Sequence, residues 1–275
     1  MTSKLLSIVT VTRNNAKGLL RTSLSVRLLK KNQPNIEWIV IDGASSDESL
    51  SVIADNADII DNWLSEHDAG IYNAMNKGIV LSSGLYLLFL NAGDALSNEI
   101  VLTDFDTLLS EKCDLYYGDA YLEFNNLKQY PDKLSIDYFF QDSLCHQSML
   151  IKSDYLKERG YEEKYKIASD LEYTMYMLFD KKCSSHHIDI PICIYESGGF
   201  SSTHYFDIAR LERREIISNH LDGGVDWYDS ILFRKELSNE NLFNVFLRLT
   251  YKRKIQSLTF SLIKALLWIH HLVTK

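Results

Sequence analysis

The chain has 275 residues, of which 46% are hydrophobic and 24% are charged, with 12 glycines and 3 prolines. That is a globular composition, and it excludes a disordered chain, a collagen-like chain and a small disulfide-stapled protein. The formal net charge of -8 disfavours nucleic acid as a partner, because a nucleic-acid-binding surface needs clustered positive charge.

The first third of the chain alternates strand and helix patterns. Apolar runs typical of strands cover residues 5–12, 36–42, 57–66 and 85–90. A first helical pattern ends at Lys31, a second follows a cap at Ser45 or Ser46, and a third covers residues 70–83. Strands that alternate with helices predict an α/β fold with a Rossmann-like, mostly parallel central sheet flanked by helices. Ligands of such sheets bind beyond the carboxyl ends of the strands.

The rest of the chain is less regular and ends in a segment of different composition. Strand patterns cover residues 114–124, 143–152 and 186–195, and helical patterns cover residues 169–181 and 206–220. Residues 241–275 carry six basic and no acidic side chains, among many leucines and aromatic residues. They predict a basic amphipathic helix that lies on the inner face of an anionic membrane, and a packed terminal helix or an oligomer interface fits the pattern equally well.

The cysteines and the apolar runs indicate the compartment. Cys113, Cys145, Cys183 and Cys193 show neither a C-x-x-C pair nor zinc-ligand spacing, which is typical of reduced thiols. The N-terminus lacks the pattern of a signal peptide, and no apolar run reaches the ~20 residues that span a bilayer. We therefore expect a cytoplasmic chain.

Two carboxylates follow predicted strands directly, at the edge where a ligand would bind. Asp42 ends the 36–42 run, where it can accept hydrogen bonds from a ribose or a base. Asp94 follows the 85–90 run beside Gly93, which leaves room for a diphosphate, and it offers an oxygen ligand to Mg²⁺ or Mn²⁺. Turn and cap chemistry suits both residues as well, and it suffices for Asp47.

A third cluster leads into the helix predicted over residues 70–83. The apolar positions of this helix, Ile71, Ala74, Met75 and Ile79, form one buried stripe and leave Lys77 on another face. Asp68 precedes the helix, where a carboxylate has a simple explanation as a cap, and Lys77 has one as a solvated side chain. Neither residue indicates a function by itself.

Four segments occur together, in this order, in one known family: VTVTRN (9–14), VIDGASSD (40–47), SEHDAGIYNAMNKGI (65–79) and FLNAGD (89–94). The chain resembles the family 2 inverting glycosyltransferases of the GT-A fold, particularly bacterial enzymes that build surface polysaccharides such as O-antigen or capsule. CHQSM (145–149) and ESGGFS (196–201) resemble further segments of the family. The resemblance implies transfer of a hexose from a nucleotide-diphosphate sugar, with inversion at the anomeric carbon.

The resemblance also implies roles for single residues. Thr10, Asp42, Asp68 and Lys77 would bind the donor, Asp94 would ligate Mg²⁺ or Mn²⁺, and His204 is a further candidate ligand. Asp94 matches the last acid of the family's D-x-D motif, whereas Ala92 stands in place of the first acid. Residues 1–95 would form the nucleotide-sugar-binding half, residues 96–220 the acceptor-binding and catalytic half, and residues 221–275 a helical extension.

An inverting transfer needs a base that deprotonates the acceptor hydroxyl. ASDLEY (168–173) matches the family segment that carries this base, and Asp170 is the predicted residue. Leu171 and Met175 belong to the buried stripe of the helix, so Asp170 lies on another face. The alternative is that Ser169 and Asp170 cap the helix, and we expect Glu172 to be solvated.

We therefore predict a cytoplasmic, membrane-peripheral glycosyltransferase that adds a sugar to a saccharide linked to undecaprenyl diphosphate. One alternative is another nucleotide-using α/β enzyme, although the absence of G-x-G-x-x-G and G-x-x-x-x-G-K-[ST] counts against dehydrogenases and kinases. The other alternative is a non-catalytic relative that binds a nucleotide sugar or scaffolds a polysaccharide assembly. Ala92, which stands in place of the first acid of the D-x-D motif, is consistent with this second alternative.

Overall fold

The computed structural model describes residues 4–122, 126–195, 206–220 and 229. The chain divides into two compact units, Met1–Val225 and Asp226–Lys275, and the described residues belong almost entirely to the first unit. His204, the ESGGFS segment and the predicted membrane-binding segment 241–275 lie outside the described residues.

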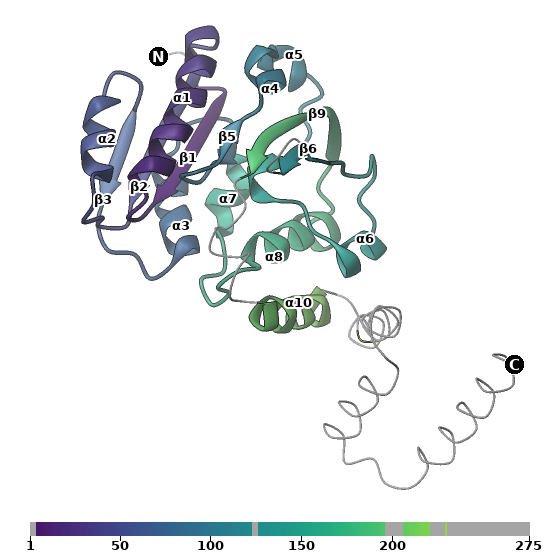
Figure 1. Ribbon diagram of the computed structural model, residues 1–275. Helices are drawn as coiled ribbons and strands as arrows, with labels where there is room; N and C mark the ends of the chain where they lie inside the picture. The colour runs from purple at the N-terminus through teal and green to yellow at the C-terminus, as the bar shows by residue number, and fades with distance from the viewer. Residues whose placement is uncertain (1–3, 123–125, 196–205, 221–228, 230–275) are drawn as a thin grey trace, which may run out of the picture. The chain divides into compact units, whose positions relative to one another are not determined.

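A nine-stranded sheet forms the centre of the first unit (Figure 1). The strands are β1 Leu6–Thr12, β2 Ile36–Asp42, β3 Asn62–Ser65, β4 Tyr86–Phe89, β5 Ala95–Leu96, β6 Leu115–Leu122, β7 Asn126–Lys128, β8 Met149–Lys152 and β9 Ser185–Tyr195. Their order is β3-β2-β1-β4-β8-β6-β9-β5, with β7 paired to β6. Strands β1 to β4, β6 and β9 run in one direction and the other three run against them, which confirms the predicted mostly parallel sheet.

Helices flank the sheet as the alternating pattern predicts. They are α1 Ala16–Asn32, α2 Ser49–Asp55, α3 Ile71–Leu81, α4 Asn98–Leu102, α5 Phe105–Leu108, α6 Ile136–Gln141, α7 Ser153–Arg159, α8 Ser169–Met175 and α10 Phe206–His220, with a 3₁₀ turn η2 His146–Ser148 and a π-helical turn η3 Tyr176–Asp180. In the order β3-β2-β1-β4, right-handed crossovers place α1 and α2 on one face of the sheet and α3 on the other. The predicted cap at Ser45 or Ser46 is wrong, because α2 begins at Ser49 and the Asp47 carboxylate accepts the Ser49 N–H at 3.0 Å.

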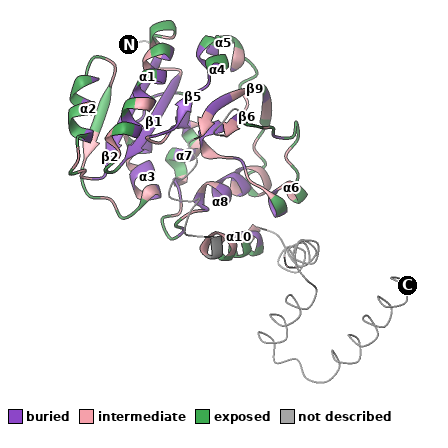
Figure 2. Cartoon of the chain, viewed as in Figure 1, coloured by how far each residue is buried: buried purple, intermediate pink, exposed green. Residues whose placement is uncertain are grey.

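Strands β1 and β2 are buried over their whole length, as Figure 2 shows. Helices cover both of their faces, so near-continuous apolar runs are what these positions require. Trp38 is the largest side chain of this core, and its exposed fraction is 0%. Each buried valine, leucine or isoleucine side chain of these strands stabilises the fold by about 1.5–3 kcal/mol through its removal from water.

The strand predicted over residues 143–152 is wrong for its first half. Only Met149–Lys152 is a strand, and His146–Ser148 is a 3₁₀ turn. Strand β8 runs antiparallel to β4, with Leu87 opposite Ile151. The turn that precedes β8 therefore lies beside the residues that follow β4, at the carboxyl edge of the parallel strands.

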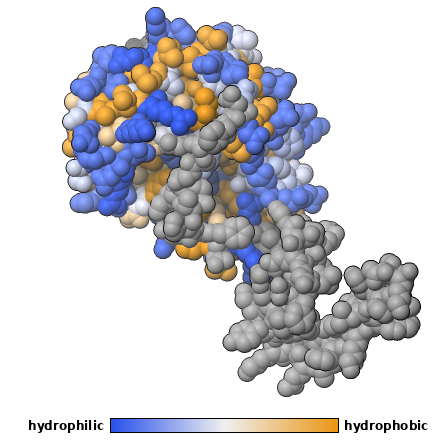
Figure 3. Space-filling model, viewed as in Figure 1, coloured by the Kyte–Doolittle hydropathy of each residue, from blue (hydrophilic) through white to orange (hydrophobic). Residues whose placement is uncertain are grey.

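Helix α1 carries exposed apolar side chains on its outer face. Leu20, Leu24 and Leu28 recur at four-residue spacing and are 49%, 59% and 55% exposed. Figure 3 shows apolar surface among hydrophilic side chains on this side of the molecule. Within the described ranges, no helix combines the length and the apolar composition that crossing a bilayer would require.

Candidate active site

The carboxyl edge of the parallel strands carries three of the predicted site residues, Asp42, Asp68 and Asp94. The loops after β1, β2, β3 and β4 meet there, because a parallel sheet ends all of its strands on one side. The Gly43 N–H donates to the Thr12 carbonyl at 2.9 Å, and the Ala92 N–H donates to the Val11 carbonyl at 3.1 Å. The loops after β2 and β4 are thus tied to the end of β1 between them.

Asp42 is fully buried at the end of β2. Its Oδ2 accepts the Ser45 N–H at 3.0 Å and the Ser65 hydroxyl at 2.6 Å. Its Oδ1 is buried and has no hydrogen-bond partner among the described residues. A buried carboxylate oxygen without a donor is costly, so this atom is suited to a donor that a ligand brings.

Gly43 and Asp68 lie in direct contact, although they are on different loops. A Cβ atom at Gly43 would lie 2.2 Å from Oδ2 of Asp68, so any other residue would displace this carboxylate from its position. Oδ1 of Asp68 accepts the Gly70 N–H at 3.1 Å, and Gly70 has a φ of 139°. The position of Asp68 therefore depends on one glycine beside it and a second two residues later.

Lys77 holds the loop that carries Asp68. Its ammonium group donates to the His67 carbonyl at 2.8 Å and pairs with the Glu66 carboxylate at 2.8 Å. The side chain is 20% exposed. Lys77 therefore lies next to the predicted donor site with its charge already paired to Glu66.

Thr10 lies inside the sheet and not at its edge. It is fully buried, and its hydroxyl accepts the indole N–H of Trp38 at 2.9 Å. Thr12, two residues later, ends the strand opposite Asp42. The Thr12 hydroxyl is buried without a partner among the described residues, so Thr12 is the threonine of β1 that reaches the edge.

Asp94 is held from two sides and is 5% exposed. The Gln147 amide donates to its Oδ2 at 2.8 Å, and its backbone carbonyl accepts the Thr22 hydroxyl at 2.7 Å. The Gly93 N–H donates in turn to the Thr22 oxygen at 3.1 Å, and Gly93 has a φ of 110°. The sequence did not indicate Thr22, whose role comes from helix α1 far from this loop in sequence.

The metal-binding capacity of this loop is small. The described part of the chain contains no group of three or more His, Cys, Asp or Glu side chains that could hold an ion. Asp94 offers one carboxylate, and the amide oxygens of Asn91 and Gln147 are buried without partners among the described residues. Because Mg²⁺ and Mn²⁺ take about six oxygen ligands, these residues fit such an ion only if a bound diphosphate and water supply the remaining ligands.

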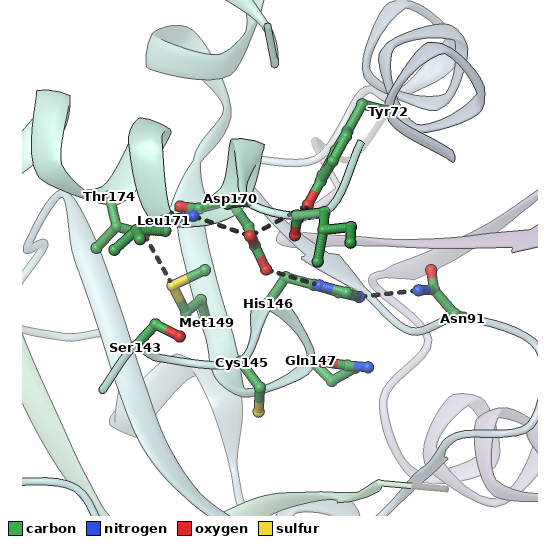
Figure 4. Close-up of polar contacts among 12 residues, drawn as sticks. Tyr72, Asn91, Ser143, Cys145, His146, Gln147, Met149, Asp170, Leu171 and Thr174 are labelled. Atoms are coloured by element: carbon green, nitrogen blue, oxygen red, sulfur yellow. Dashed lines mark hydrogen bonds and ion pairs between the residues drawn. The ribbon is translucent and has the colours of Figure 1, made fainter. Parts of the chain in front are cut away.

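Asp170 lies in the first turn of α8, with both carboxylate oxygens engaged (Figure 4). Its Oδ1 accepts the Leu171 N–H at 2.9 Å and the Tyr72 hydroxyl at 3.2 Å. Its Oδ2 lies 3.2 Å from Nδ1 of His146, and the side chain is 17% exposed. The N-cap position of α8 is Ala168, so the alternative that Ser169 and Asp170 cap this helix is wrong.

His146 connects Asp170 to the loop after β4. Its Nε2 lies 2.9 Å from Nδ2 of Asn91, and Figure 4 shows the ring between the two partners. Burial lowers the pKa of His146, but the hydrogen bond and charge of Asp170 and the charge of Asp94 outweigh burial and raise it. The sequence offered one signal for this residue, the CHQSM segment, but the strand predicted there concealed it.

Helix α10 supports the segment that leads into Asp170. The Glu212 carboxylate accepts the N–H groups of Lys166 at 2.7 Å, Ile167 at 3.0 Å and Ala168 at 3.0 Å. Three N–H groups on one carboxylate hold this segment in place from a helix that follows it by some 40 residues in the chain. No local pattern in the sequence indicates such a contact.

The prediction that Glu172 is solvated is wrong. Glu172 is 5% exposed, and its carboxylate pairs with Arg159 of α7 and with Nε2 of His220 at 3.3 Å. Burial alone would raise the pKa of Glu172, but the hydrogen bonds and charges of its two partners outweigh burial, so the pKa lies below its ordinary value. The Glu172 carboxylate is therefore bound by two ion-pair partners, where the helical pattern predicted that water would surround it.

Comparison with known proteins gives a family match. The sequence model described as Glycosyl transferase family 2 matches residues 7–178. A Mycobacterium bovis protein named PGL/p-HBAD biosynthesis glycosyltransferase is 28% identical over 177 residues, which is 62% of this chain and 69% of that protein. An uncharacterized glycosyltransferase of Mycobacterium tuberculosis is 30% identical over 203 residues, 71% of this chain and 76% of the relative.

Two solved structures share the fold at low sequence identity. Staphylococcus aureus TarS in complex with UDP-GlcNAc has a TM-score of 0.63 at 18% identity, covering 86% of this chain and 73% of that chain. A mannosyltransferase from Pyrobaculum calidifontis in complex with GDP-Man and Mn²⁺ has a TM-score of 0.56 at 11% identity, covering 90% and 81%. These two proteins align with this chain over most of its length.

Proposed function

Because the chain belongs to glycosyl transferase family 2, we propose that the carboxyl edge of its sheet binds a nucleotide-diphosphate sugar and transfers the hexose, with inversion, to a saccharide acceptor. The chain has the GT-A fold and is a glycosyltransferase. The observation that carries the finer proposal is the presence of Asp170 at the same edge as Asp42, Asp68 and Asp94. Asp170 is thereby available as a base, next to three carboxylates that are suited to binding a nucleotide sugar.

Asp42 would bind the nucleoside. Its unpartnered Oδ1 accepts an N–H of the base or a hydroxyl of the ribose, which removes the cost of leaving it buried and unpaired. The hydroxyl of Thr12 lies in register beside it and offers both a donor and an acceptor. The neighbours solved with UDP-GlcNAc and with GDP-Man support a nucleotide sugar as the ligand class.

The loop from Asn91 to Asp94 would face the diphosphate. Asp94 and the amide oxygen of Asn91 would hold Mg²⁺ or Mn²⁺ together with the diphosphate, and the bound ion would neutralise charge on the leaving group. We expect Mn²⁺ to bind the protein weakly alone and much more tightly with a nucleoside diphosphate. Calorimetric titration of Mn²⁺ into the wild type and into Asp94→Asn, each with and without UDP or GDP, measures this difference. Equal affinity in all four titrations contradicts a metal site at Asp94.

Asp170 would act as the base. A carboxylate oxygen of Asp170 accepts the proton of the acceptor hydroxyl while the hydroxyl oxygen attacks the anomeric carbon. The new C–O bond forms on the face opposite the departing diphosphate, whose bond to the anomeric carbon breaks, so the configuration inverts. The Tyr72 and Leu171 hydrogen bonds fix Oδ1, which leaves the carboxylate in one orientation for this proton transfer.

The acceptor would be a saccharide linked to undecaprenyl diphosphate at the inner membrane face. The basic segment 241–275 supports a membrane surface as the place of reaction. A flotation assay with anionic liposomes compares the full chain with a chain ending at Glu240. Flotation of the full chain alone supports the proposal, and equal failure of both chains contradicts it.

A donor panel tests the function as a whole. Nucleotide release and thermal shift are measured with UDP-, GDP- and dTDP-sugars, in the presence of Mg²⁺ or Mn²⁺. Release of nucleotide with one donor supports the proposal, and the absence of any shift with any nucleoside diphosphate contradicts it. Binding without release favours the non-catalytic relative that the Ala92 replacement suggests.

A further inference from the structure

Two consecutive residues of the turn before β8 contact two different carboxylates of the site. Nδ1 of His146 lies 3.2 Å from Oδ2 of Asp170, which is on α8. The amide nitrogen of Gln147 donates to Oδ2 of Asp94, at 2.8 Å, in the loop after β4. The proposed base and the proposed diphosphate-side carboxylate are thus both hydrogen-bonded to one short segment of the chain. Figure 4 shows His146 of this segment beside Asp170.

We propose that His146 and Gln147 are positioning residues, which together fix the spacing between Asp170 and Asp94. His146 sets the orientation of the carboxylate that receives the acceptor proton, and Gln147 sets that of the carboxylate beside the leaving group. The inference rests on the proposed function of these two aspartates and deepens it. Neither positioning residue exchanges a proton or a bond with the substrate.

The turn is built to hold a fixed geometry. The Cys145 N–H donates to the Tyr130 hydroxyl at 3.0 Å, and the Ser148 hydroxyl donates to the Cys145 carbonyl at 3.0 Å. Gln147 is 2% exposed, and β8 continues the turn directly into the sheet between β4 and β6. Few rotamers are open to side chains buried in this way, so displacement of the turn would displace both aspartates.

The hydrogen bonds around His146 also assign its protons. Nδ2 of Asn91 lies 2.9 Å from Nε2 of the ring, and Oδ2 of Asp170, which can only accept a hydrogen bond, lies 3.2 Å from Nδ1. Nδ1 then carries the ring proton and donates it toward Asp170. Asp170 is held by three donors from three segments, namely the Leu171 N–H, the Tyr72 hydroxyl and the His146 ring.

Substitutions at the two residues separate positioning from general support of the turn. His146→Leu removes the donor and keeps an apolar side chain of similar bulk, and we expect kcat to fall about 100-fold with the KM for the donor unchanged. His146→Asn keeps a donor near the place of Nδ1 and is expected to recover much of kcat. His146→Gln places its amide nearer to Nε2, on the Asn91 side, and is expected to recover little.

Gln147→Leu is the matched variant in the adjacent position. We expect it to raise the KM for the donor about tenfold and to lower kcat much less than His146→Leu does, because it releases Asp94, on the diphosphate side, and not Asp170. Similar losses of kcat and similar rises of KM at both positions, with equal effects of Asn and Gln at His146, would show that the turn has only a structural role. That result overturns the inference.

A second measurement does not depend on turnover. Nitrogen-15 NMR of the His146 ring in the wild type is expected to show a hydrogen-bonded Nδ1–H, and Asp170→Asn is expected to shift the Nδ1 resonance. If the wild type transfers no sugar from any donor, the proposed function fails, and this NMR result still decides whether His146 and Asp170 are coupled. The inference alone fails if the wild type is active, His146→Leu leaves kcat unchanged, and Asp170→Asn leaves the Nδ1 resonance unchanged.

Discussion

Glu37 and Asp42 lie near opposite ends of strand β2, and both are buried, with exposed fractions of 6% and 0%. Glu37, near the amino end, accepts hydrogen bonds on both carboxylate oxygens, from the hydroxyls of Ser7 and Ser83 and from the N–H groups of Ser83 and Gly84. Asp42, at the carboxyl end, has one oxygen with no partner among the described residues. The same strand therefore carries one satisfied carboxylate and one that is open to a ligand.

The difference teaches how to distinguish support from function in this sheet. An unmade hydrogen bond on a buried group costs about 1–3 kcal/mol, so a fold retains it where something else recovers that free energy. Among the described residues, Thr12, Asn91 and Gln147 carry further buried atoms without partners at the carboxyl edge, and other such atoms lie elsewhere, as in Glu172 and Tyr173 of α8. We expect substitutions at this edge to affect ligand binding and transfer, and substitutions at the amino edge to affect stability.

The largest expected effect is at Asp170. Asp170→Asn keeps the shape of the side chain and removes the base, so transfer is expected to fall by about 1,000-fold while the protein still binds the donor. Steady-state kinetics and calorimetric titration of the nucleotide sugar measure the two quantities. If the variant loses donor binding but keeps its turnover per bound donor, Asp170 binds the donor and does not act as the base.

Two glycines, one at each edge, give the next comparison. At Gly84 a Cβ would lie 2.6 Å from the backbone nitrogen of Ser7, which cannot move away, so Gly84→Ala is expected to cost about 3 kcal/mol of unfolding free energy. At Gly43 the clash is with the Asp68 carboxylate, which can rotate. Gly43→Ala is therefore expected to raise the donor KM about tenfold with little change in urea unfolding. Equal loss of stability in both variants would remove the distinction.

The two carboxylates of β2 sharpen the same comparison. Glu37→Gln replaces an acceptor by a donor among groups that donate to it, and it is expected to lower the free energy of unfolding by about 2 kcal/mol without changing nucleotide affinity. Asp42→Asn is expected to weaken nucleotide binding about tenfold and to leave stability nearly unchanged. Urea unfolding measures the free energy of unfolding of each variant, and titration with UDP or GDP measures its nucleotide affinity.

The smallest expected effect concerns pH and lies away from both edges. Partners raise the pKa of His220 above its ordinary 6.5, against the opposing effect of burial, and lower the pKa of Glu172 below its ordinary 4.5. The His220 contribution to stability is complete below 6.5 and is lost as pH rises through its raised pKa. The Glu172 contribution is complete above 4.5 and is lost as pH falls through its lowered pKa.

His220→Gln removes one partner of this ion pair. The difference in unfolding free energy between wild type and variant is therefore expected to be largest between about pH 4.5 and 6.5 and to shrink on both sides. Urea unfolding in buffers from pH 4 to 9 measures it. A difference that does not vary with pH would mean that His220 supports α8 by packing alone.

The parts of this molecule that the sequence predicted share a local cause. Strand β2 has the predicted bounds, 36–42, because a strand covered on both faces must be apolar throughout. Helix α10 has the predicted bounds, 206–220. Asp42 ends β2 and Asp94 follows β4, as the apolar runs predicted, and the carboxyl ends of parallel strands are where such sheets place ligands.

The parts that the sequence did not predict depend on pairing between distant segments. His146 was placed in a strand, because nothing local shows that only the last four residues of 143–152 pair with β4 and β6. Glu172 was expected in water, because its partners Arg159 and His220 belong to other helices. Thr10 fits a ligand-binding motif, but its hydroxyl bonds to Trp38 inside the sheet.

The hydrogen bonds of Glu212 bear on where the catalytic unit ends. The family match stops at residue 178, just after the helix that carries Asp170. Yet the segment leading into that helix has three N–H groups bound by Glu212, 34 residues beyond the match. An excised unit that keeps these three hydrogen bonds must therefore include α10, because a unit ending at residue 178 would release the segment that leads into Asp170.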